Sequence, residues 1–133
     1  MRAASRLVSA RPAAGAAIAW LTAVAVFAQA PPAGVKNPIA ASAESVAAGK
    51  QSYTRLCAPC HGTSAEGGAG NDLIPASPDL TDREWEHGAS DGEVFASIRN
   101  GIGPEFNMTP FKDRLTDTEI WNVVNYLRSI AKK

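Results

Sequence analysis

The chain has 133 residues, and its 13 basic and 13 acidic side chains give a formal net charge of zero. Neither this balance nor any cluster of basic residues indicates a nucleic-acid partner. The length allows one small domain with a modest hydrophobic core once a targeting segment is set aside.

Residues 1–28 are typical of a secretory signal. Three arginines precede a mostly apolar run over residues 13–28, and neither part contains an acidic residue. These are the charged and hydrophobic regions that the export machinery recognises. Small or medium side chains mark two possible cleavage sites, after Ala28 and after Ala30. Cleavage after Ala28 is favoured, because Pro31 directly follows the second site.

An uncleaved membrane anchor is the alternative for this segment, although its apolar run is shorter than the ~20 residues that a membrane span needs. Cleavage would leave 105 residues with a formal charge of −3, since the segment holds three basic residues and no acidic ones. We therefore expect an exported, periplasmic protein. Membrane association would follow only if the N-terminal segment stayed attached.

Residues 29–41 are expected to form an extended lead, because they contain three prolines and show little hydrophobic periodicity. Residues 42–133 then form the predicted domain. Its first helix should begin near Ser42 or Ser45 and continue to Leu56. Gly49 lies on the apolar face of this helix, where glycine is ~1 kcal/mol less favourable than alanine. It indicates close packing of another backbone, unless it is simply tolerated there.

The first helix leads directly into Cys57-Ala58-Pro59-Cys60-His61. This spacing is the one used for covalent attachment of a c-type haem. Each thiol adds across one haem vinyl group, and one turn of backbone spans the gap between the two vinyls. His61 then lies under the iron, where its neutral imidazole can be the proximal ligand. The motif predicts one covalently attached haem c with its iron.

Two other chemistries use cysteines at this spacing. A dithiol redox centre of the thioredoxin type often has proline between its cysteines, but it normally follows a strand of a βαβ unit, whereas Cys57 follows a helical pattern. A tetrahedral zinc site would need four ligands from two cysteines, two histidines and scattered carboxylates. Haem attachment is the interpretation that the surrounding sequence favours.

The segment after His61 is rich in glycine and proline, which predicts an irregular loop of about twenty residues. Three capping boxes then mark helix starts, at Thr81 with Glu84, Ser90 with Glu93, and Thr116 with Glu119. The first of these helices should end near Gly88, the second at Asn100-Gly101, and the third should run to the C-terminus. The predicted fold class is all-α.

Met108 is the only methionine outside the signal segment, and it lies in the predicted loop between the last two helices. A methionine of the core would more often lie on an apolar helical face. Its thioether sulfur is a recognised second axial ligand of haem iron. Pro110 and Phe111 can fix the loop and shield the sulfur from water.

Taken together, the motifs resemble those of small class I c-type cytochromes over about Ser45–Ala131. The resemblance implies a cytochrome c fold, in which the first and last helices cross near Gly49 and short helices and loops surround one haem. The residues expected on the facing side of the crossing are Trp121, Tyr126 and Leu127. The residues expected to hold the cofactor are Cys57, Cys60, His61, Pro78, Leu80, Met108 and Phe111.

The resemblance also implies individual roles. His61 and Met108 would bind the iron, and the carbonyl of Pro78 would accept the other ring N–H of His61. Thr109 departs from the simplest pattern, in which proline often follows the methionine. Pro75 is a competing choice for the carbonyl.

The implied function is one-electron transfer between periplasmic or membrane redox partners, which dock transiently at the exposed haem edge, with no catalytic residues. The first alternative is a cytochrome subunit of a dehydrogenase or oxidase complex. The second is a peroxide- or gas-binding haem protein, for which only His87 could assist. His87 is expected to be exposed or to cap a helix end, and Trp85 is expected to pack in the haem pocket.

Overall fold

The structure is a computed structural model that describes residues 34–68, 77–105 and 107–133. The predictions for the signal segment and for Pro75 concern residues outside this part of the chain. Four helices make up the fold: α1 (Ala43–Leu56), α2 (Ala58–His61), α3 (Asp91–Asn100) and α4 (Asp117–Ile130). Pairing of β type in the described part is limited to one isolated bridge, Ile102 with Met108. The all-α prediction is confirmed, and none of the described helices has the length and apolarity to cross a membrane.

Three helices begin where their capping residues predict. The side chain of Ser42 accepts a hydrogen bond from the backbone N–H of Ser45 at the start of α1. Ser90 and Thr116 form complete capping boxes at the starts of α3 and α4. The prediction that the last helix reaches the C-terminus is wrong by one turn, since the backbone leaves helical geometry at Ala131.

The capping box at Thr81 does not start a helix. The carboxylate of Asp79 accepts hydrogen bonds from both the backbone N–H of Thr81 (2.7 Å) and its hydroxyl (2.6 Å). The carbonyl of Thr81 in turn accepts from the backbone N–H of Lys132 (2.7 Å). Thr81 is therefore buried, and its hydrogen bonds hold the loop before α3. Because no helix forms here, His87 does not lie at a helix end.

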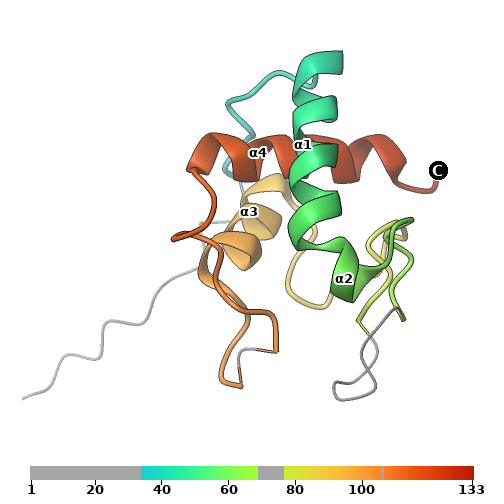
Figure 1. Cartoon of the computed structure of the whole chain (residues 1–133), viewed down its shortest axis with the longest axis vertical. Coiled ribbons are helices and arrows are strands. Elements are labelled where there is room, and N and C mark those ends of the chain that lie inside the picture. Colours follow the sequence, from blue (N-terminus) through green and yellow to red (C-terminus); the bar gives the residue numbers. More distant parts are fainter. Residues whose placement is uncertain (1–33, 69–76, 106) are drawn as a thin grey trace, which may run out of the picture.

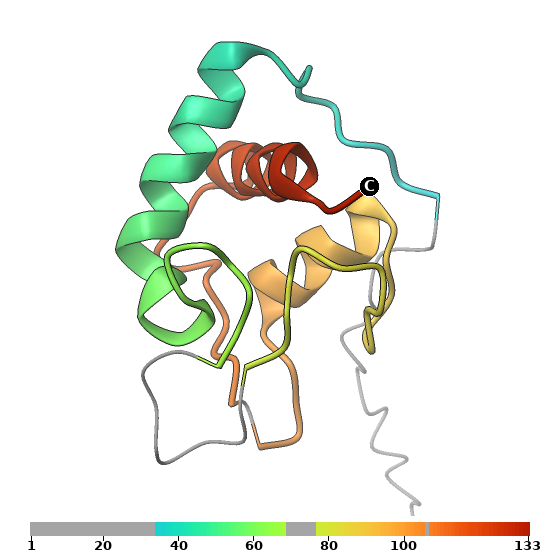
Figure 2. The ribbon, with the colours of Figure 1, turned by 90° about the vertical axis from the view of Figure 1, so that its right-hand side faces the viewer.

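Helices α1 and α4 cross one another, as both ribbon views show (Figure 1 and Figure 2). At the crossing, a Cβ on Gly49 would collide with the backbone carbonyl of Asn122. The ring of Tyr53 on α1 lies 5.2 Å from that of Tyr126 on α4. The expected close approach at Gly49 is confirmed, and Tyr126 faces α1 as predicted.

The other two residues expected at the crossing have different neighbours. The ring of Trp121 stacks on Phe95 of α3 at 4.1 Å, and Leu127 lines a cavity on the inner side of α4. Helix α4 is therefore buried on several sides, and only part of its apolar surface faces α1.

Replacing Gly49 with alanine is expected to lower the free energy of unfolding by about 3 kcal/mol, because the new methyl group would force the two backbones apart. Denaturant unfolding followed by helical circular dichroism measures this change. Lys50→Ala is the matched control, since Lys50 is exposed on the same helix, and it should shift stability by no more than about 0.5 kcal/mol. Equal stabilities of the two variants would show that the crossing tolerates a side chain.

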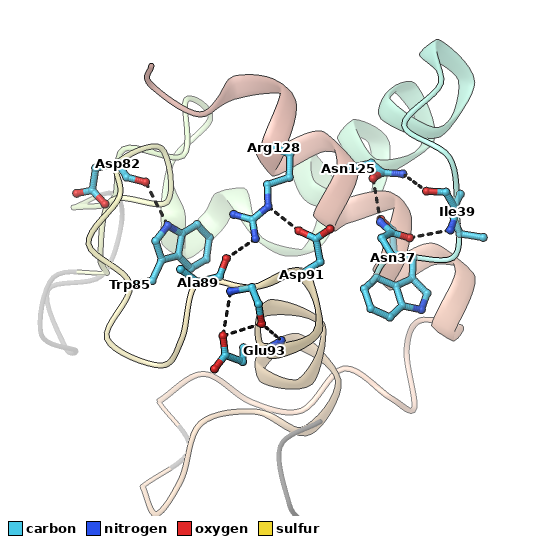
Figure 3. A network of polar contacts seen from close by, with 11 residues as sticks. Asn37, Ile39, Asp82, Trp85, Ala89, Asp91, Glu93, Asn125 and Arg128 are labelled. Atoms are coloured by element: carbon cyan, nitrogen blue, oxygen red, sulfur yellow. Dashed lines mark hydrogen bonds and ion pairs between the residues drawn. The ribbon is translucent and has the colours of Figure 1, made fainter. Parts of the chain in front are cut away.

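The described part of the lead, residues 34–41, contains no helix or strand and lies against α4 (Figure 3). The amide of Asn37 donates to the backbone carbonyl of Trp121 (3.0 Å) and to the side-chain oxygen of Asn125 (2.8 Å). Asn125 is buried and donates back to the carbonyl of Ile39 (3.1 Å). Earlier in the lead, Val35 packs against Gly92 at the start of α3. This segment is a strap fastened to the domain.

Candidate cofactor site

A cavity of about 450 Å³ opens beside α2. Its walls come from α2, the loop before α3, α3 itself and the loop that follows it, and the lining is mostly apolar. A volume of this size is within the ~300–1,000 Å³ range of cofactor pockets. The structure brings all seven residues expected to hold the cofactor to this cavity: Cys57, Cys60, His61, Pro78, Leu80, Met108 and Phe111.

The cysteine motif is held in place by α1. Cys57 ends α1, and α2 carries the rest of the motif, with Pro59 in its first turn. The buried hydroxyl of Tyr53 donates to the backbone carbonyl of Gly62 (2.7 Å), immediately after His61. Because Tyr53 also packs on α4, the crossing of the two long helices fixes the position of the motif.

The surroundings of Cys57 oppose a dithiol redox centre. Burial, with a smaller contribution from Cys60, raises the pKa of the Cys57 thiol to about 11. Dithiol exchange needs the thiolate, which redox centres favour by lowering this pKa. The motif also follows a helix, as the sequence predicted. For the zinc alternative, the described residues hold no group of three histidine, cysteine or carboxylate side chains able to bind a metal.

The surroundings of His61 favour the neutral imidazole that a metal ligand needs. Burial lowers its pKa and so favours the neutral ring, and an interaction with the backbone carbonyl of Pro78 opposes this only in part. Nδ1 is nevertheless buried without a hydrogen-bond partner of full geometry among the described residues. A buried ring nitrogen without a hydrogen-bond partner is unusual in a protein core. It is consistent with a ring that takes its final orientation only when a cofactor is bound.

The position of Pro78 depends on close contacts that the sequence analysis missed. Gly67 has φ of +73°, and a Cβ there would collide with the carbonyl of Ser77. Backbone hydrogen bonds join Gly68 to Ser77 (3.1 Å) and Leu80 to Ala65 (2.8 Å). The glycine-rich composition was the only signal for this contact, and it did not identify Gly67.

A second contact that sequence reasoning missed holds Asp79, next to Pro78. The Thr81 hydroxyl and backbone N–H, assisted by Lys132, lower the pKa of Asp79 to about 2. The ammonium of Lys132 lies 3.0 Å from the Asp79 carboxylate and joins the end of the chain to this wall of the cavity. Asp79 therefore stays ionised and keeps the loop closed at neutral pH.

Met108 lies in a loop, as predicted, and lines the cavity. Ile102 donates from its backbone N–H to the carbonyl of Met108 (2.9 Å), and Phe111 donates to the carbonyl of Ile98 on α3 (3.1 Å). These bonds hold the loop at Met108 itself and at Phe111, three residues later. Its side chain is partly buried, and Phe111 beside it is buried.

The donor set fits a haem. Two thiols and a neutral imidazole come from one helix end, a thioether comes from a pinned loop, and an apolar cavity lies among them. Residues 44–127 match the family described as cytochrome c oxidase, cbb3-type, subunit III. The chain belongs to this family of cytochrome c domains. Haem c with its iron is the cofactor of the domain.

Curated relatives of the chain are subunits of cbb3-type oxidases. It is 33% identical over 91 residues to cbb3-type cytochrome c oxidase subunit FixP of Azorhizobium caulinodans, which covers 64% of this chain and 29% of the relative. It is 30% identical over 95 residues to subunit CcoP of Rubrivivax gelatinosus, covering 70% and 28%. The chain thus spans less than a third of the length of these relatives.

Solved structures confirm the cytochrome c fold. Cytochrome cL of Methylophaga aminisulfidivorans superposes with a TM-score of 0.57 at 29% identity, over 68% of this chain and 55% of that one. Cytochrome cL of Hyphomicrobium denitrificans gives a TM-score of 0.60 at 25% identity, over 77% and 60%. The predicted resemblance to small c-type cytochromes is therefore confirmed.

Proposed function

We propose that this cytochrome c domain is an electron carrier, which passes single electrons between redox proteins and has no catalytic residues of its own. The observation that supports it is one cavity lined by both cysteines, His61 and Met108. When bound, the haem iron supplies one-electron chemistry by alternating between its ferrous and ferric states. The protein's contribution is to hold the group rigidly and to keep water away from it.

Seven of the residues that line the cavity are proposed to have a role in that task. Cys57 and Cys60 would attach the haem covalently, and His61 would bind its iron, with the carbonyl of Pro78 orienting the ring. Met108 would supply a second iron ligand through its thioether sulfur. Leu80 and Phe111 would keep water away from the bound group.

Location and assembly are part of the proposal. Residues 1–28 direct export to the periplasm, residues 29–41 form the lead, and residues 42–133 form the haem domain. Partners dock transiently at the exposed haem edge, and the domain is held at the membrane if its N-terminal segment is retained. The family match favours one alternative, in which this domain works as part of a cbb3-type oxidase.

Covalent attachment is the direct test of the cofactor assignment. Acid-acetone extraction should leave the pigment on the exported protein, because two thioether bonds hold it. The intact mass should equal that of the chain from about Gln29 plus one haem. A pigment that extracts freely, or two thiols that react with alkylating reagents in the native protein, would contradict the assignment.

A further inference from the structure

Among the described residues, the aspartate, glutamate, lysine and arginine side chains that line the cavity are all acidic. They are Asp79, Glu84, Glu86 and Glu105. Glu84, Glu86 and Glu105 are exposed, and none of the ion pairs in the described chain involves them. We call these three the rim carboxylates. His87 is the one other exposed ionisable side chain of the lining.

Several basic side chains line a separate depression. Its lining includes Arg83, Arg128, Lys132 and Lys133, and it shares Trp85 with the cavity. Arg128 is engaged by the carboxylate of Asp91 (2.8 Å) and extends over the indole of Trp85 (Figure 3). Lys132 is engaged by Asp79 and Glu66. None of the ion pairs in the described chain brings a lysine or arginine to the rim carboxylates.

From this segregation of charge we infer that the rim carboxylates guide a redox partner whose docking surface is positively charged. Uncompensated charge around an apolar opening steers an oppositely charged surface toward it and increases the association rate by about 10–1,000-fold in known cases. Redox encounters bury little area, so a few charges can decide how the partner is oriented. The inference rests on the proposed function, because the opening matters for docking only if an electron leaves through it.

Small redox reagents of opposite charge can test this without a known partner. Reduced holoprotein gives one electron to cationic tris(phenanthroline)cobalt(III), which becomes cobalt(II), or to anionic hexacyanoferrate(III), which becomes hexacyanoferrate(II). In each case the haem iron goes from ferrous to ferric. Stopped-flow absorbance gives both second-order rate constants, measured at one fixed pH because His87 lies on the same rim.

The test variant is Glu84→Gln/Glu86→Gln/Glu105→Gln. Its rate with the cationic reagent should fall by about 3- to 10-fold at low ionic strength, and its rate with the anionic reagent should rise. Glu86→Gln alone should have a larger effect than Glu44→Gln, which removes one exposed carboxylate at the far end of α1. The differences should disappear near 1 M salt, where the screening length is about 3 Å.

All variants must keep the parent spectrum and reduction potential, so that only the encounter changes. Equal effects of Glu86→Gln and Glu44→Gln, or an effect of the triple variant that survives high salt, would overturn the inference and leave the carrier function standing. Holoprotein that transfers electrons to neither reagent would contradict the carrier function itself, and the inference with it.

Discussion

Met108→Ala is expected to open the haem iron to external ligands and to lower its reduction potential. A thioether ligand favours ferrous iron, so its loss should lower the potential by on the order of 100 mV, within the ~0.8 V range that axial ligands set. The parent protein should be low-spin, should show a weak sulfur-to-iron charge-transfer band when oxidised, and should bind little carbon monoxide when reduced. The variant should lose the band and bind carbon monoxide readily.

Thr109→Ala is the matched control for this experiment. Thr109 follows Met108 in the same loop, lines the same cavity and is exposed, so its replacement tests the loop without touching the sulfur. It should keep the charge-transfer band and the parent potential. Rapid carbon monoxide binding or substantial peroxide turnover by the unmutated protein would favour the gas- or peroxide-binding alternative.

His61→Ala is expected to prevent accumulation of a stable holoprotein. Loss of groups that merely support a metal ligand already costs about 10–100-fold in affinity or activity, so the ligand itself should matter at least as much. Yield of low-spin holoprotein, measured from the reduced absorption spectrum of exported protein, should fall to less than about a tenth of the parent value.

His87→Ala provides the comparison, because His87 also lines the cavity but is exposed on its rim. This variant should keep the yield, the low-spin spectrum and nearly the same potential. Loss of low-spin character in the His87 variant would assign the distal ligand to that residue in place of Met108.

Predictions from the sequence succeeded where a local pattern determines the structure. The attachment motif needs only five consecutive residues, and the capping boxes at Ser90 and Thr116 need four. Thr81 has the same local pattern, but Asp79 two residues earlier competes for its hydroxyl, and Lys132 binds its carbonyl from the other end of the chain. A capping box therefore predicts a helix only where the hydroxyl and the backbone of its first residue have no other hydrogen-bond partner.

The contacts that sequence reasoning missed join residues far apart in the chain. Asn37 and Asn125 are 88 positions apart, and no local pattern announces their hydrogen bond. Gly67 could not be singled out among its neighbouring glycines, because its importance comes from the carbonyl of Ser77 pressed against it. Gly49 was found because glycine on an apolar helical face is itself anomalous.

If the N-terminal side of this domain is held at the membrane, the strap along α4 shortens the distance that the domain can move from its point of attachment. Eight residues, 34–41, are laid against the domain by Asn37 and Asn125, and free extended chain would cover about 25–30 Å over that number of residues. Because residues 34–41 are held against the domain, they cannot lengthen a flexible N-terminal linker. Such a linker would leave the domain near Val35, which contacts Gly92 at the start of α3. Asn125→Ala would remove the hydrogen bonds that hold residues 34–41 and so lengthen the flexible linker, while every residue lining the haem cavity stays unchanged.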